Sequence, residues 1–177
     1  MPRIPPLTDD QALPAARELL DEQRAAHGRV TNMKRTLAHS PTALRSLMTW
    51  YDLHAEVVEF LGTRRTTLFA HAISSQTDCL ICSTFFRRWL KESGEDPDRL
   101  ELDERDRAVV AFGRQLARDA NAVSDEVFAG LSRFLQPAQI VTLTAFGGLM
   151  IATNVFNNAL RVDLDEYLLP FRAGVAR

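Results

Sequence analysis

Apolar residues that recur every three or four positions constrain this chain more than any other feature of its sequence. The clearest stripe lies within residues 41–60 and is made of Leu44, Leu47, Met48, Tyr51, Ala55 and Val58. Charged residues fall off this stripe, which is the pattern of an amphipathic helix. Ser40 and Pro41 precede it as an N-cap and a first-turn proline. The sequence therefore predicts one long helix over residues 41–60.

Similar signals predict helices along most of the chain. They are expected over 14–27, from a break at residues 61–63 through Leu68 to about Gln76, over about 79–93, from the cap Asp103 past Leu116, and over about 125–134, 137–160 and about 163–168, with a short segment at 31–38. Residues 1–8 contain three prolines and are expected to form an extended arm. Because no segment alternates cleanly between apolar and polar residues, we predict an all-α chain that forms a single domain over 1–177.

The charge balance argues against two classes of partner. The chain has 21 basic and 23 acidic residues in 177, a formal net charge of -2 and a pI near 6.1. We therefore expect no nucleic acid partner and no anionic membrane partner. The N-terminus lacks the apolar run of a signal peptide, and two cysteines are too few for a disulfide scaffold, so we predict a cytoplasmic protein.

Residues 138–160 contain no charged residue and are long enough to raise the question of a membrane span. Several polar side chains interrupt this stretch, among them Asn154, Asn157 and Asn158. Such amides are costly to place in hydrocarbon. We therefore predict a helix that is buried in the domain or in an oligomer interface.

The pair Cys79 and Cys82 is the most compact group of residues with chemical capacity. Residues three apart share a helix face, so the two sulfurs can meet with little backbone movement. At a helix N-terminus, free N–H groups and the helix dipole stabilise a thiolate, which favours Cys79 as the more acidic thiol. Asp78 opposes this effect through its charge.

Two other roles for the cysteines stay open at this point. Both can be small core residues beside Phe85, Phe86 and Trp89, because free cysteine is among the most buried residue types. A zinc site needs about four ligands, and the sequence offers no second such pair, so no metal is expected. Redox chemistry is the remaining interpretation.

Three stretches resemble the carboxymuconolactone decarboxylase-like proteins, and specifically their AhpD-like alkylhydroperoxidase branch. They are residues 32–41, the start of the helix with Cys79 and Cys82, and residues 154–160. The resemblance spans about residues 30–162. It implies an all-α AhpD-like helical domain, a homo-oligomer (trimer or hexamer), and a hydroperoxide or disulfide substrate. It also implies a dithiol reducing partner and no cofactor.

The same resemblance implies that Cys82 attacks the peroxide and that Cys79 resolves the product into a disulfide. The family carries a glutamate twelve residues before its first cysteine, where this chain has Thr67. It carries a histidine four residues after its second cysteine, where this chain has Phe86, and some members have a histidine where Ile81 stands. Three proton-handling positions are therefore replaced.

His71 lies one helical turn after Thr67, on a polar strip with Ser74 and Asp78. We predict that it replaces the lost proton relay, the alternative being a surface histidine. His54, in contrast, is expected at the boundary of an apolar face. The predicted function is thus a thiol-dependent peroxidase or disulfide oxidoreductase with Cys82, Cys79 and His71 at its site. The alternatives are an inactive or redox-sensing helical oligomer and, last, a lactone decarboxylase.

Overall fold

The computed structural model describes residues 1–173, and this range consists of helices and connecting turns without a strand. The helices are α1 (Pro14–His27), α2 (Asn32–Leu37), α3 (Pro41–Met48), α4 (Trp50–Gln76), α5 (Leu80–Glu92), α6 (Glu104–Arg118), η1 (Ala120–Ala122), α7 (Asp125–Ser132), α8 (Pro137–Leu160) and η2 (Glu166–Phe171). The predicted all-α class is confirmed.

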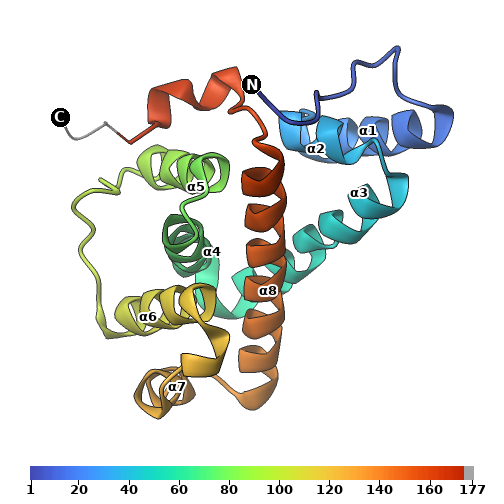
Figure 1. Cartoon of the computed structure of the whole chain (residues 1–177). Helices are drawn as coiled ribbons and strands as arrows, with labels where there is room; N and C mark the ends of the chain where they lie inside the picture. The colour runs from blue at the N-terminus through green and yellow to red at the C-terminus, as the bar shows by residue number, and fades with distance from the viewer. Residues whose placement is uncertain (174–177) are drawn as a thin grey trace.

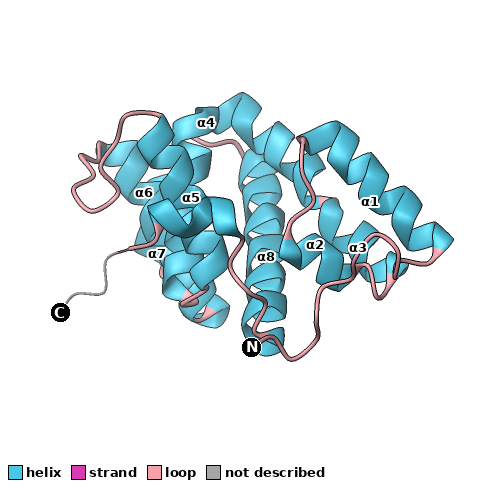
Figure 2. Cartoon of the chain, turned by 90° about the horizontal axis from the view of Figure 1, so that it is seen from above, coloured by secondary structure: helices cyan, strands magenta, loops and turns pink. Residues whose placement is uncertain are grey.

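Helix α8 runs through the middle of the molecule and packs along α4 (Figure 1). Seen from above, α8 separates the group α1–α3 from the group α5–α7 (Figure 2). Helix α4 also contacts α5 and α6, and the main core forms among these elements. Phe69 of α4 stacks there on Phe112 of α6 and on Phe146 of α8. A smaller apolar cluster holds α1 against α2 and α3.

Helix α8 is the helix of residues 1–173 whose length and hydropathy would allow it to cross a membrane. Its residues Leu143, Phe146 and Met150 are buried in the main core of the domain. Its polar residues Asn154 and Asn157 are also buried, and both donate hydrogen bonds to the cysteine turn or its neighbours. These contacts are those of the core helix expected from the sequence.

The structure corrects the expected helix over residues 41–60. That stretch is divided at Thr49, whose hydroxyl donates a hydrogen bond to the carbonyl of Ser46 at 2.7 Å. Thr49 keeps backbone angles near those of a helix (φ -59°, ψ -10°), so α3 ends at Met48 and α4 begins at Trp50 with a single residue between them. The break expected at residues 61–63 is present as a kink within α4, where Gly62 adopts non-helical angles between two helical segments.

The chain ends differ in part from expectation. Residues 1–8 form no helix, and this arm is fixed by backbone N–H groups of Arg3 and Leu7, which donate to the carbonyls of Leu160 and Arg35. The C-terminal helix expected over 163–168 is a 3-10 helix that starts three residues later, at Glu166. The arm is therefore tied to the C-terminal end of α8, and η2 packs against α5.

Candidate functional site

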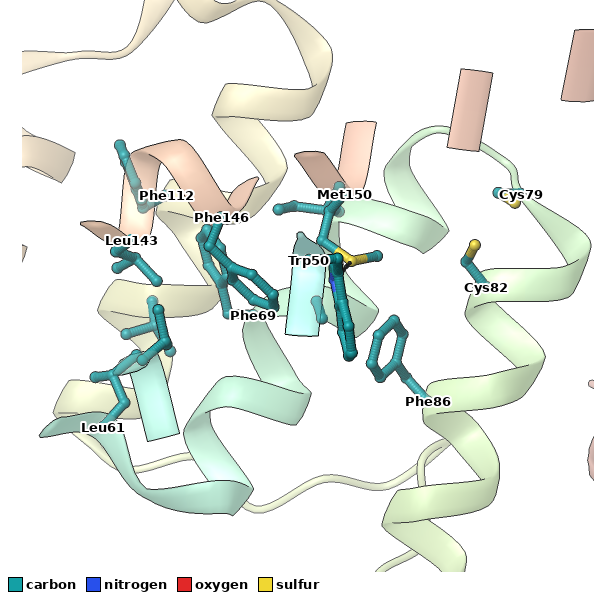
Figure 3. Packing of buried hydrophobic residues seen from close by; sticks show 14 of the residues in the cluster. Trp50, Leu61, Phe69, Cys79, Cys82, Phe86, Phe112, Leu143, Phe146 and Met150 are labelled. Atoms are coloured by element: carbon teal, nitrogen blue, oxygen red, sulfur yellow. Dashed lines mark hydrogen bonds between the residues drawn. The ribbon is translucent and has the colours of Figure 1, made fainter. Parts of the chain in front are cut away.

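The cysteine pair lies where a tight turn joins α4 to α5. Asp78 adopts a left-handed conformation with φ 53°, which reverses the chain within three residues. The Cys79 N–H then donates to the carbonyl of Ser74 at 3.0 Å. Cys79 is the N-cap of α5 and Cys82 is in its first turn, as predicted. The two sulfur atoms point toward one another (Figure 3).

An asparagine of α8 joins the two thiols. The side-chain nitrogen of Asn157 lies 3.3 Å from the sulfur of Cys82 and 4.0 Å from that of Cys79. Asn154 and Asn158 hold the preceding turn by donating to the hydroxyl and the carbonyl of Thr77, at 2.8 Å and 2.9 Å. Three amides of one helix therefore fix the position of the cysteine turn.

The environment makes the two thiols unequal. A hydrogen bond from Cys82 lowers the pKa of Cys79, and the backbone N–H groups of Cys82 and Ile81 and the Asn157 amide do so as well, against the opposing effect of burial. The hydrogen bond to Cys79, burial and the negative charge of Cys79 raise the pKa of Cys82. Because the pair titrates as a unit, its singly ionised form carries the charge on Cys79 and the proton on Cys82.

Cys82 also lines an apolar cavity of about 90 Å³. The cavity walls include Met33, Trp50, Phe85, Phe86 and Met150, of which Trp50, Phe86 and Met150 appear beside Cys82 in Figure 3. Trp50 donates its indole N–H to the sulfur of Met150 at 2.7 Å. This leaves mainly apolar surface toward the cavity.

Two residues stand where the family that the sequence resembles carries proton-handling groups, and both are structural. Phe86 is 2% exposed and packs edge-on against Phe85 and Trp89. Thr67 is buried, and its hydroxyl donates to the carbonyl of Thr63 within α4. Neither side chain can supply a proton acceptor to the thiols.

The two histidines discussed in the sequence analysis, His71 and His54, do not take part in the hydrogen bonds of the two thiols in the described residues. Within residues 1–173, no hydrogen bond joins His71 to Cys79 or Cys82; its nearest polar partner is the hydroxyl of Ser75 at 3.5 Å. Burial and the charges of Arg87 and Arg114 lower the pKa of His71 to about 4. His71 is thus neutral near pH 7, and the relay remains a prediction that a substitution must test.

His54 occupies an aromatic environment instead. Its ring stacks on Trp50 with the centroids 4.6 Å apart and lies 5.6 Å from Trp89. Burial lowers the pKa of His54, and its Nε2 atom is buried without a hydrogen-bond partner in the described part of the chain. Among residues 1–173, no group of three or more His, Cys, Asp or Glu side chains lies together as a metal site would require.

The sequence interpretation assigned no role to Asn157. Polar residues at three- and four-residue spacing in an otherwise apolar helix, as at Asn154, Asn157 and Asn158, indicate a polar contact inside the core. The same amides argue against a membrane span. The partner of these amides depends on how α8 lies against the turn at Cys79, which a single sequence does not specify.

Comparison with known proteins identifies the fold of this chain. No protein-family model matches the sequence, and no curated protein matches it either. Among solved structures, the chain is similar to an uncharacterised peroxidase-related protein from Ralstonia eutropha JMP134, described as an alkylhydroperoxidase AhpD core, with TM-score 0.78 and 18% identity over 94% of both chains.

It is also similar to the debrominase Bmp8, with TM-score 0.76 and 16% identity over 95% of both chains. A cysteine-to-alanine variant of Bmp8 in complex with 2,3,4-tribromopyrrole superimposes with TM-score 0.77 at 16% identity, covering 95% of this chain and 94% of that one. The expected AhpD-like helical fold is therefore confirmed. At such low identity the likeness concerns the fold alone.

Proposed function

We propose that this chain is a thiol-dependent oxidoreductase that reduces hydroperoxides, or exchanges disulfides, through Cys82 and Cys79. The observation that carries the proposal is the position of Cys82, which lines an apolar cavity and is hydrogen-bonded to a more acidic thiol. The likeness to a peroxidase-related protein of the same fold supports it. A dithiol partner would reduce the resulting disulfide, and no metal or organic cofactor is required.

In the proposed reaction Cys79 serves as the base that Thr67 and Phe86 cannot supply. The Cys79 thiolate takes the proton of Cys82, and the Cys82 sulfur attacks the hydroperoxide. A sulfur–oxygen bond forms while the oxygen–oxygen bond breaks, and the alkoxide takes a proton from water to leave as the alcohol. Cys79 then attacks the Cys82 sulfenic acid, which forms the disulfide and releases water. Two thiols are oxidised and one hydroperoxide is reduced.

The test is intact mass and free-thiol count after a short exposure of the reduced protein to cumene hydroperoxide near pH 7. We expect the loss of two hydrogens and of both thiols. The Cys79→Ser variant lacks both the proposed base and the resolving thiol, so it should form a sulfenic acid on Cys82 more slowly, and dimedone should trap it. The Cys82→Ser variant should give no such adduct. The His71→Ala variant in the same assay tests the predicted relay, and an unchanged rate would remove His71 from the site.

Thiols that stay free until the pH approaches about 8.5, the value of ordinary cysteine, would contradict the proposal. The chain would then be the alternative helical oligomer, in which the cysteines serve packing.

A second candidate reaction is reductive dehalogenation of an aromatic ring. The aromatic walls beside Cys82 favour it, as does the likeness to a debrominase. The Cys82 sulfur would take the halogen while the ring carbon takes a proton, and Cys79 would then form the disulfide and release halide. Incubation with 2,3,4-tribromopyrrole should release one bromide for each disulfide formed. If neither bromide nor a disulfide appears, this reaction is excluded.

A further inference from the structure

The cavity beside Cys82 contains an unexpected charged residue. The chain has only two lysines, and Lys34 of α2 is 3% exposed and lines this cavity. The hydroxyl of Thr31 accepts the backbone N–H of Lys34 at 3.3 Å, which places the residue in the first turn of α2. Its ammonium lies 5.0 Å from the centre of the Tyr51 ring. Within residues 1–173 the Lys34 side chain forms no salt bridge and donates no hydrogen bond.

A buried ammonium without a partner is unfavourable, because burial removes water that would stabilise its charge. This effect lowers the pKa of Lys34 to about 8. A cation over an aromatic face is only weakly stabilised, so Tyr51 offsets only part of the loss. The three N–H donors of the ammonium are therefore free to bind a group that enters the cavity.

We propose that this cavity binds an organic anion, with an apolar body against the aromatic walls and a carboxylate or phenolate on the Lys34 ammonium. The inference rests on the proposed function in one respect: the reacting group of such a substrate would lie toward Cys82 on the cavity wall. It goes further by naming the charge of the substrate and the residue that selects it.

The other charged and titratable groups around Lys34 belong to several elements. Asp165 lines the same cavity; its Oδ1 accepts the N–H of Asn32 at 2.8 Å, and its Oδ2 is buried without a partner in the described chain. Burial raises the pKa of Asp165, and as a carboxylate it opposes an anion. His27 stacks on Tyr51 with the ring centroids 3.6 Å apart, and its pKa is lowered by burial and by the charge of Lys34.

Tyr167 lines the cavity, and two arginines that are not part of the cavity wall lie over its ring. The guanidinium groups of Arg29 and Arg88 lie 4.1 Å and 5.3 Å from the centre of its ring. Burial raises the pKa of Tyr167, as it does that of Tyr51, so both phenols are neutral near pH 7. Neither arginine lines the cavity, and Arg88 is paired with Glu92 at 2.7 Å, so Lys34 is the cation of the cavity wall that an entering anion would meet.

The test measures binding of 3-phenylpropionate and of its neutral counterpart 3-phenylpropan-1-ol to the reduced full chain by calorimetry at pH 7. We expect the anion to bind at least tenfold more tightly than the alcohol. Lys34→Met should abolish this preference and leave the affinity for the alcohol unchanged. Lys91→Met, which removes the exposed lysine of α5, is the matched control and should keep the preference.

Two further measurements do not depend on the folding of the Lys34 variant. The preference of the wild-type chain should disappear between pH 7 and 9.5, as the ammonium loses its proton. Asp165→Asn, which keeps an oxygen for the Asn32 N–H, should tighten binding of the anion.

Equal affinities in the wild type, no binding of the anion, or a preference that survives at pH 9.5 would overturn the proposal. Because no peroxide is present and no thiol reacts, failure of the redox function would not alter these results.

Discussion

Asn157 is the buried residue of α8 whose side chain lies beside both thiols. Its amide donates to the sulfur of Cys82 at 3.3 Å and lies 4.0 Å from that of Cys79, and it lowers the pKa of each. It stabilises whichever sulfur carries the negative charge. Among the side chains outside the pair, this amide is the one that favours ionisation of both cysteines.

Replacing Asn157 by Ala should therefore raise the pKa of the thiol pair and slow its oxidation. A hydrogen bond to a charged group is worth about 1.5–3 kcal/mol, and one pKa unit is about 1.4 kcal/mol. We expect an upward shift of about one unit and a rate near pH 7 that falls about tenfold. Ultraviolet absorbance of the thiolate against pH gives the shift. Asn158→Ala, whose amide bonds the Thr77 carbonyl instead, is the control. Identical titrations of the two variants would contradict this role.

At the level of helices, Gly62 sets the course of α4 between the aromatic cavity and the cysteine turn. Its angles, φ 77° and ψ 157°, lie in a region that is essentially restricted to glycine. No atom lies within 4 Å of the position where a Cβ would stand, so the restriction is one of backbone conformation and not of space.

Gly62→Ala should therefore destabilise the chain by about 1–3 kcal/mol. Gly148→Ala is the matched control, because this glycine lies in the regular part of α8 and a Cβ there also meets no atom within 4 Å. Alanine in a helix interior is favoured over glycine by about 0.5–1 kcal/mol, so the control should be slightly more stable than the wild type. Urea unfolding measures both, and equal losses would contradict the role of the kink.

Helix signals in the sequence predicted which helices exist better than they predicted where those helices end and which residues they contact. Pro137 and the following apolar run predicted α8 with both of its ends. The stripe over 41–60 failed at Thr49, because apolar spacing does not reveal an interruption of a single residue. The cysteine turn was predicted from local spacing, whereas the partners of its thiols come from α8, 75 and 78 residues away. Contacts at such separation depend on packing, which local patterns do not encode.

At the scale of the whole molecule, two apolar side chains remain on the surface where α7 meets α8. Phe128 is 49% exposed and Val141 is 69% exposed, and both line one hollow. An exposed apolar patch of this kind is typical of an interface between proteins. The predicted homo-oligomer would use such a surface.

We therefore expect the purified chain to sediment as a trimer or hexamer and Val141→Glu to shift it toward the monomer. Leu13→Glu is the control, because Leu13 is 73% exposed at the start of α1 and lies outside this hollow. Sedimentation velocity at several concentrations measures the state. A monomeric wild type would contradict the oligomer, and an unchanged Val141→Glu variant would place its interface elsewhere.

The buried ammonium of Lys34 makes the stability of the whole domain depend on pH in a direction that can be derived. Its pKa is about 8 in the folded chain, against an ordinary value of 10.5. Between these values the unfolded chain binds more protons than the folded chain, so the free energy of unfolding rises with pH. Below pH 8 both states are protonated, and the full penalty of burying the charge is present.

Relative to Lys34→Met, the wild type should therefore gain up to about 3 kcal/mol as the pH rises from 8 to 10.5, since each pKa unit is about 1.4 kcal/mol. Tyr51, whose pKa is raised to about 12, acts in the opposite sense above pH 10, but it is common to both proteins and cancels in their difference. Urea unfolding under reducing conditions at a series of pH values measures this difference. Lys91→Met should run parallel to the wild type. A Lys34→Met curve that is also parallel would mean that the ammonium is hydrated in the cavity, and the anion site would then lose its physical basis.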